Sequence, residues 1–92
     1  MRTLTLNYYQ DPSHGWVKIK RDKLITLFIE HLISSYSYQL KDNVYLEEDN
    51  DLARLFKACD ELQIQVKLKE YHTNKSSKIR AYDQFQSIVK GL

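Results

Sequence analysis

The sequence predicts one small α+β domain over residues 1–92, with a mainly antiparallel sheet of about five strands, two main helices packed on one face and a short C-terminal helix. The chain's 92 residues are enough for one hydrophobic core but not for two. Apolar residues make up 42% and charged residues 28%, with two glycines and one proline, which is globular composition. Stretches of period two alternate with stretches of helical period, in the order β-β-α-β-β-α-β-α.

The first two elements are expected to be strands joined by a turn. Residues 3–9 alternate apolar and polar side chains, which is typical of a half-buried strand. Segment 10–15 contains the only proline and one of the two glycines, so a turn is expected there. In the second strand, 16–20, Val17 and Ile19 share the apolar face. The opposite face is basic with one aromatic residue and carries Trp16, Lys18 and Lys20.

A helix and a hairpin are expected next. Asp22 is a candidate N-cap, because its carboxylate can accept hydrogen bonds from the free amides of a first turn. Apolar residues recur at helical spacing from Leu24 to Leu32, and their stripe is wide enough to predict a well-covered helix. Residues 36–40 and 44–46 then alternate on either side of a polar turn, which indicates a β-hairpin.

An acidic run at 47–51 precedes a second amphipathic helix over residues 52–62. Negative charge at a helix N-terminus is favourable because of the helix dipole, at about 0.3–1 kcal/mol for each carboxylate. Asp49 or Asn50 is the candidate cap of this helix. The acidic run therefore has a structural explanation before any functional one.

The last elements are expected to be a strand and a short helix. Residues 64–69 alternate between an apolar and a basic face, which predicts a fifth strand. A polar loop at 72–77 leads to residues 82–89, whose apolar spacing predicts a terminal helix ending near Gly91. With the helices packed on one face of the sheet, the other face is expected to be exposed.

Composition also excludes some classes of protein. No stretch approaches the roughly 18 apolar residues of a membrane span, and the N-terminus lacks a signal-peptide pattern. The single cysteine, Cys59, lies among apolar residues at helical spacing, so we expect a buried thiol in a reducing compartment. These observations predict a cytoplasmic protein without a membrane partner. A net charge of +2 does not by itself indicate a polyanion partner.

Catalytic motifs are missing from the sequence. It has neither a Gly-x-Ser-x-Gly elbow nor a glycine-rich phosphate loop, so we expect a non-enzymatic protein with no cofactor. One alternative is a small metal-dependent enzyme, although helix capping and loop hydrogen bonds explain the same residues more simply. Its candidate ligands are His14, His72, Glu47, Glu48, Asp49 and Asp51.

Four segments form a distinctive combination: DPSHGW at 11–16, SSYSY at 34–38, YLEEDND at 45–51, and HT at 72–73 with IRAY at 79–82. Together they resemble a family of small uncharacterised proteins encoded by bacteriophages and other mobile elements, in which glycine usually stands at the position of Ser13. The resemblance implies no activity. It implies a phage or plasmid accessory protein in a bacterial cytoplasm, and such proteins often bind host machinery.

The first functional hypothesis is a non-enzymatic binding module that docks on a host protein. One such target is a CRISPR effector, which would make the chain an anti-CRISPR-like inhibitor of host defence. The chain has seven tyrosines, a residue type enriched at protein interfaces. The candidate contact residues are Trp16, Tyr36, Tyr38, Tyr45, Glu47, Glu48, Asp49 and Asp51.

The alternative is a nucleic-acid-binding accessory protein that uses a basic, aromatic face of the sheet. Lysines would neutralise phosphates while aromatic rings stack on bases. The same lysines also have an ordinary role in keeping exposed strands soluble. The candidate residues are Trp16, Lys18, Lys20, Lys67, Lys69 and Arg80. An exposed sheet face is also compatible with a homodimer, although no sequence pattern specifies one.

Overall fold

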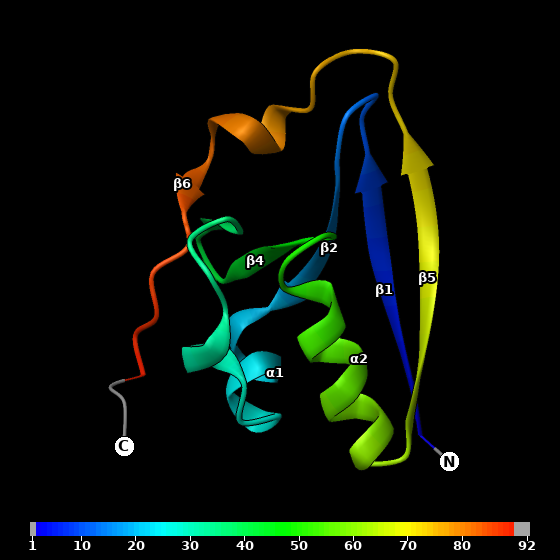
Figure 1. Ribbon diagram of the computed structural model, residues 1–92, viewed down its shortest axis with the longest axis vertical. Coiled ribbons are helices and arrows are strands. Elements are labelled where there is room, and N and C mark those ends of the chain that lie inside the picture. The colour runs from blue at the N-terminus through cyan, green and yellow to red at the C-terminus, as the bar shows by residue number, and fades with distance from the viewer. Residues whose placement is uncertain (1, 90–92) are drawn as a thin grey trace.

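The computed structural model describes residues 2–89, which form six strands, two α-helices and two 3-10 turns (Figure 1). The strands are β1 (Arg2–Gln10), β2 (Gly15–Lys20), β3 (Tyr38–Leu40), β4 (Asn43–Glu47), β5 (Ile64–His72) and β6 (Asp83–Gln84). The helices are α1 (Arg21–Thr26) and α2 (Leu52–Glu61), and the 3-10 turns are η1 (Glu30–Leu32) and η2 (Lys78–Ala81). The predicted α+β class is confirmed, with one more strand than expected.

The strands form one mixed sheet in the order β5-β1-β2-β4-β3-β6. Only β1 and β5 pair in parallel, and every other pair among the described strands is antiparallel. All nine residues of β1 are in register with β5, from Arg2 opposite Ile64 to Gln10 opposite His72. Figure 1 shows these two long strands side by side at one edge of the domain.

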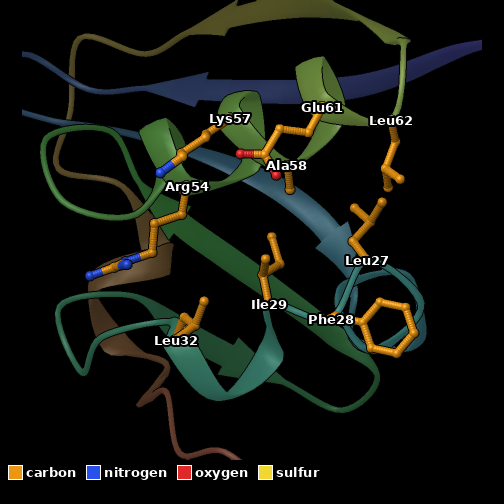
Figure 2. Close-up of a pocket in the computed structure, with 9 residues that line it drawn as sticks. All are labelled: Leu27, Phe28, Ile29, Leu32, Arg54, Lys57, Ala58, Glu61 and Leu62. Carbon is orange, nitrogen blue, oxygen red and sulfur yellow. The ribbon is translucent and has the colours of Figure 1, made fainter.

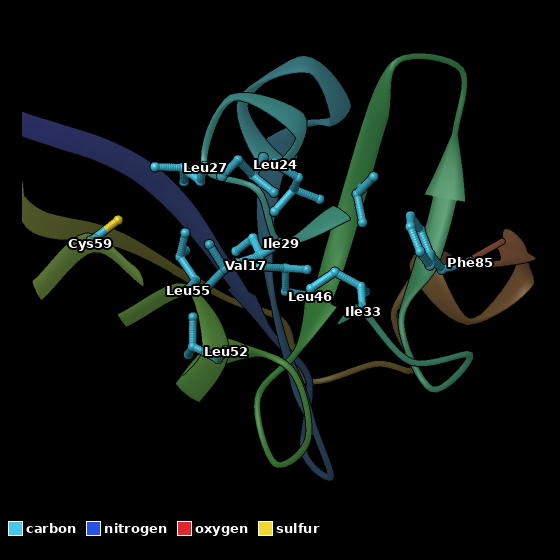
Figure 3. Packing of buried hydrophobic residues seen from close by; sticks show 12 residues of the cluster. Val17, Leu24, Leu27, Ile29, Ile33, Leu46, Leu52, Leu55, Cys59 and Phe85 are labelled. Carbon is cyan, nitrogen blue, oxygen red and sulfur yellow. The ribbon is translucent and has the colours of Figure 1, made fainter. Parts of the chain in front are cut away.

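The hydrophobic core lies between the sheet and the two helices (Figure 3). Val17 and Leu46, which are partners across β2 and β4, are fully buried there. Leu24 of α1 and Leu55 of α2 cover them from the helical side and are equally inaccessible. The apolar side chains of β1 and β5 extend the same core to the edge of the sheet. This face is the one that the alternating pattern assigned to the interior.

The first helix is shorter than predicted. α1 ends at Thr26, and Phe28 adopts a left-handed conformation with φ of 61°. The reversal lets the backbone N–H of Ile29 donate to the carbonyl of Leu24, and it turns the side chain of Ile29 into the core. In a helix that continued through Leu32, only the apolar residues on one helical face would be buried. The turn instead buries apolar residues that lie before it and after it in the chain.

The terminal helix predicted over residues 82–89 is wrong. Strand β6 begins at Asp83, and no helix follows in the described residues through Val89. The reason is tertiary, because Phe85 is buried in the main core and its N–H donates to the carbonyl of Ser37. The predicted end of the helix near Gly91 lies outside the described residues.

The predicted caps are also wrong. α1 begins at Arg21, so Asp22 lies inside its first turn and not before it. The N-cap position of α2 is Asp51, and its carboxylate makes no capping hydrogen bond. That carboxylate instead accepts hydrogen bonds from Ser34 and Ser37, which hold the segment leading into β3. Asn50 donates to Glu47.

The second face of the sheet is covered at one end by the segment that contains η2. Ile79 packs on Trp16 and Tyr45 to form a second, smaller core. The expectation of a fully exposed second face is therefore wrong at this end. No helix of the described residues is long and apolar enough to cross a membrane.

Candidate functional site

Four lysines share the part of the second sheet face that η2 leaves open. Lys18 of β2 and Lys69 of β5 both align with Asn7 of the intervening strand β1. Since side chains alternate between faces along a strand, Lys20 lies on the same side of the sheet as Lys18, and Lys67 lies on the same side as Lys69. The structure thus brings together all four strand lysines of the predicted nucleic-acid set, and Lys20, Lys67 and Lys69 are exposed while Lys18 is half-buried.

The strand between the lysines is polar and uncharged on this face. Thr3, Thr5 and Asn7 alternate with the apolar residues of β1 and therefore point to the lysine side. In β1, β2 and β5, no carboxylate side chain lies on this face. Glu70 of β5 has the opposite parity and accepts a hydrogen bond from Gln10. On this face, therefore, no acidic side chain of the three strands neutralises the lysines.

An aromatic pair lies at one end of the lysine rows. Tyr9 and Tyr71 are register partners whose rings stack with centroids 5.3 Å apart and planes inclined by 21°. The ammonium group of Lys69 lies 5.8 Å from the centre of the Tyr71 ring. A pocket of about 360 Å³ opens beside the pair, and Lys75 and Lys78 contribute to its wall. Basic and aromatic groups are therefore continuous from the strands into this pocket.

We use the name "basic sheet face" for the open surface formed by these residues. Its members are Thr3, Thr5, Asn7, Tyr9, Lys18, Lys20, Lys67, Lys69, Tyr71, Lys75 and Lys78.

Trp16 and Arg80 do not contribute open groups to this face, contrary to prediction. Trp16 is only 2% exposed, because the η2 segment lies over it. Arg80 lies over the Trp16 ring, with its guanidinium carbon 5.2 Å from the ring centre. The same guanidinium donates to both carboxylate oxygens of Asp11, at 2.7 and 3.0 Å. Arg80 thus holds the η2 segment in place.

The acidic run is mostly structural. Asp51 and Glu47 are buried, so the prediction that they form part of an exposed contact surface is wrong. Glu48 is half-buried and accepts a hydrogen bond from the hydroxyl of Tyr8. Burial, reinforced by this carboxylate, raises the pKa of Tyr8 to about 12. Of the predicted acidic contacts, only Asp49 is exposed.

The predicted tyrosine contacts are divided between surface and interior. Tyr36 is 66% exposed but lies in a turn before β3, so it does not share a strand face with Tyr38. Tyr38 is half-buried and makes an edge contact with Trp16 at 6.3 Å between ring centres. Tyr45 is buried, and this burial, together with Tyr82, raises its pKa to about 12. Of these three predicted tyrosines, only Tyr36 is exposed.

The structure does not place the two predicted histidine ligands in one cluster. His14 precedes β2 and faces Glu47, with 3.5 Å between its Nδ1 and the Glu47 Oε1. His72 ends β5 on the exposed edge of the sheet, in register with Gln10. Among the described residues, the potential metal ligands that gather are His14, Glu47 and Asp49.

An apolar groove between α2 and the segment 27–32 that follows α1 was missed by sequence reasoning (Figure 2). It has a volume of about 430 Å³, and Figure 2 shows Leu27 and Ile29 on one side with Ala58 and Leu62 on the other. Phe28 stands at its rim with 81% of its surface exposed. Sequence periodicity assigned Phe28 to the buried stripe of a longer helix, and only the left-handed turn moves it outward.

Tyr9, Lys75 and Lys78 were also missed as members of the basic sheet face. The alternation of β1 does contain the signal for Tyr9, because it has the parity of Thr5 and Asn7. The loop lysines had no such signal.

Comparison of the chain with known protein families, with curated proteins and with solved structures found no match in any of the three. The resemblance to small phage proteins therefore stays a prediction.

Proposed function

We propose that this protein is a non-enzymatic accessory protein of a phage or mobile element that binds single-stranded nucleic acid in the bacterial cytoplasm. The observation that carries the proposal is the basic sheet face. Lys18, Lys20, Lys67 and Lys69 lie on one open surface, and no carboxylate of the three strands lies on that face. Such a surface attracts a polyanion even though the net charge of the chain is only +2.

The spacing of the lysines suits a single strand. The lysines of β2 and β5 are separated by two strand intervals, or roughly 9–10 Å, with polar β1 between them. Phosphates of a chain that follows β1 would then be within reach of the long lysine side chains on both sides. The uncharged side chains of Thr5 and Asn7 leave room for it and offer hydrogen bonds.

The stacked tyrosines supply a place for bases. Tyr71 is 40% exposed, and its ring already packs on Tyr9, so stacking on a base requires little further ordering. Base stacking on an aromatic ring contributes about 1–3 kcal/mol by alanine substitution and tolerates any base. Lys75 and Lys78 beside the ring would hold the adjoining phosphate. We therefore expect binding with little sequence preference.

Fluorescence anisotropy with a labelled single-stranded oligonucleotide of about 15 nucleotides tests this proposal. Four phosphate contacts predict a slope of about −3 for log affinity against log salt. Affinity should then fall about 50-fold between roughly 50 and 200 mM salt. No binding at the lower salt concentration, or binding that does not depend on salt, would refute the proposal.

Charge-reversal variants locate the surface. The double variant Lys67→Glu/Lys69→Glu should weaken binding more than about tenfold, because two contacts become repulsive. The matched control is Lys23→Glu/Lys57→Glu, which makes the same charge change at exposed helical positions on the other side of the sheet. Equal losses in both double variants would mean that only net charge matters and that this face is not the site.

A second candidate function, docking on a host protein, is favoured by Phe28. An aromatic side chain that is 81% exposed beside an apolar groove has the character of an interface anchor. The groove between α2 and segment 27–32, and not the tyrosine set predicted from sequence, would then form the centre of the contact. A host-defence complex is the class of target that the family resemblance suggests.

Affinity purification from bacterial lysate with and without nuclease separates the two functions. For docking, a stoichiometric host protein should survive nuclease treatment with the native chain and be lost with Phe28→Ser. For nucleic-acid binding, the co-purifying proteins should disappear on digestion, and Phe28→Ser should behave like the native chain. Retention of the same host protein by Phe28→Ser would rule out the groove as its docking site.

A further inference from the structure

Three potential metal ligands meet where β2 begins and β4 ends. His14 lies immediately before β2, Glu47 is the last residue of β4, and Asp49 follows two positions later. The pairing of Trp16 with Glu47 brings the two strand ends together. One ligand atom from each of the three side chains lies within 4.8 Å of the others. The cluster is separate from the basic sheet face, and its argument does not depend on nucleic-acid binding.

Two of these ligand atoms are buried and lack a hydrogen-bond partner. The Glu47 side chain is only 8% exposed, and its Oε2 accepts hydrogen bonds from the Asp49 backbone and the Asn50 side chain. Its Oε1 accepts none and faces the equally unpartnered Nδ1 of His14 at 3.5 Å. The indole N–H of the neighbouring Trp16 is unpartnered as well. Buried polar atoms normally have partners, so this concentration points to a bound group.

We propose that His14, Glu47 and Asp49 bind a divalent transition-metal ion, and that Zn²⁺ is the ion that fits best. Zinc takes imidazole nitrogen and carboxylate oxygen at about 2.0–2.2 Å, which places neighbouring ligands of a tetrahedron roughly 3.3–3.5 Å apart. The observed separation of 3.5 Å between His14 Nδ1 and Glu47 Oε1 already matches this value. These two atoms are therefore already at the separation that two ligands of one zinc ion require.

Asp49 completes the protein ligands from the solvent side. Its side chain is exposed, whereas Glu47 is held by two hydrogen bonds to its other oxygen. Three protein ligands leave the fourth position of a tetrahedral ion to water. An imidazole in the set disfavours Ca²⁺ and Mg²⁺, which prefer oxygen ligands.

The test is titration of the untagged, chelator-treated chain with Zn²⁺ alone, followed by isothermal calorimetry and by the melting temperature. We expect one ion per chain and a melting temperature that rises with Zn²⁺ concentration. Ca²⁺ should produce no comparable shift. Absence of binding at millimolar Zn²⁺ would overturn the proposal. So would a number of bound ions per chain that changes only when histidines outside the cluster are replaced.

Ligand variants show where the ion binds. His14→Gln and Asp49→Ala change exposed side chains, so both variants should fold, and each should weaken Zn²⁺ affinity about 100-fold or more, since even an outer-shell partner costs 10–100-fold. The matched controls are His31→Gln and His72→Gln, which remove exposed histidines elsewhere. Native affinity in His14→Gln, or equal losses in the controls, would show that the cluster is only a His–Glu ion pair.

Discussion

The Asp11–Arg80 ion pair should determine whether the η2 segment stays on the sheet. The Asp11 side chain is 1% exposed and that of Arg80 is 34% exposed. Besides both guanidinium contacts, the Asp11 carboxylate accepts hydrogen bonds from the backbone N–H groups of Ser13, His14 and Ser77. The pair therefore ties the turn after β1 to η2. Arg80→Gln removes the charge of the exposed partner and leaves the buried carboxylate.

The cost of this substitution can be estimated from burial. Removing one partner of a fully buried ion pair costs about 3–5 kcal/mol, because the other charge is left buried and uncompensated. Arg80 is one-third exposed, so water can partly replace it. Three backbone N–H groups also remain on the Asp11 carboxylate. We therefore expect a loss of about 2–3 kcal/mol in the free energy of unfolding.

Urea unfolding monitored by the fluorescence of the single tryptophan is the appropriate assay, because Trp16 lies beneath Arg80 and Ile79. Arg54→Gln is the matched control, since Arg54 is an exposed arginine of α2. Its effect should stay within about 0.5 kcal/mol. A loss below about 1 kcal/mol in Arg80→Gln, with the control unchanged, would refute the view that this pair holds the segment.

The same pair predicts a dependence of stability on pH. The guanidinium of Arg80, followed by the backbone N–H groups, holds the pKa of Asp11 well below its usual range. An unfolded aspartate titrates near pH 3.9, so the folded state binds fewer protons there than the unfolded state. The contribution of Asp11 is therefore complete above about pH 4 and is lost progressively as the pH falls below that value. Asp11→Asn should remove this part of the acid sensitivity, as acid titration of the melting temperature would show.

Three further substitutions test packing and backbone geometry. Leu46→Ala, at a fully buried position, should lower the free energy of unfolding by about 2–5 kcal/mol in urea titrations; a loss under 1 kcal/mol would contradict the core assignment. Gly15→Ala would place a Cβ 2.5 Å from the Tyr8 ring, so the melting temperature should fall. Ultraviolet titration should also show the pKa of Tyr8 moving down from about 12. An unchanged titration would count against this contact. Phe28→Asn should raise the free energy of unfolding by up to about 1 kcal/mol, because asparagine tolerates the left-handed conformation better, and any destabilisation would mean that the phenylalanine ring stabilises the turn.

Sequence patterns predicted strands well and helix ends poorly, for a physical reason. Strand alternation depends only on which face of the sheet is buried, and this face is the same from Thr3 to Leu6 of β1 and from Ile64 to Leu68 of β5. The end of α1 depends instead on Phe28 entering a left-handed conformation that few side chains favour. The turn accompanies the burial of Ile29, which is a tertiary contact, and the local sequence contains no glycine or asparagine that would have indicated a turn.

The candidate site was predictable to the extent that it follows from strand parity. Lys18, Lys20, Lys67 and Lys69 could be assigned to one face because each alternates with apolar residues. Burial of Trp16 could not be predicted, since it depends on Ile79, more than sixty positions later in the chain. The His14–Glu47 contact depends in the same way on the register between β2 and β4.

The parallel pairing of β1 with β5 sets an order for folding. Every pair in this ladder joins residues about sixty positions apart, whereas β2, β3, β4 and α1 lie close together in sequence. A nascent chain can therefore assemble its middle strands early, while β1 waits with one edge free until the final third of the chain has been synthesised. An unpaired edge with alternating apolar residues is a site for wrong pairing with another chain. Aggregation during synthesis should therefore respond more to changes in β5 than to changes in the helices.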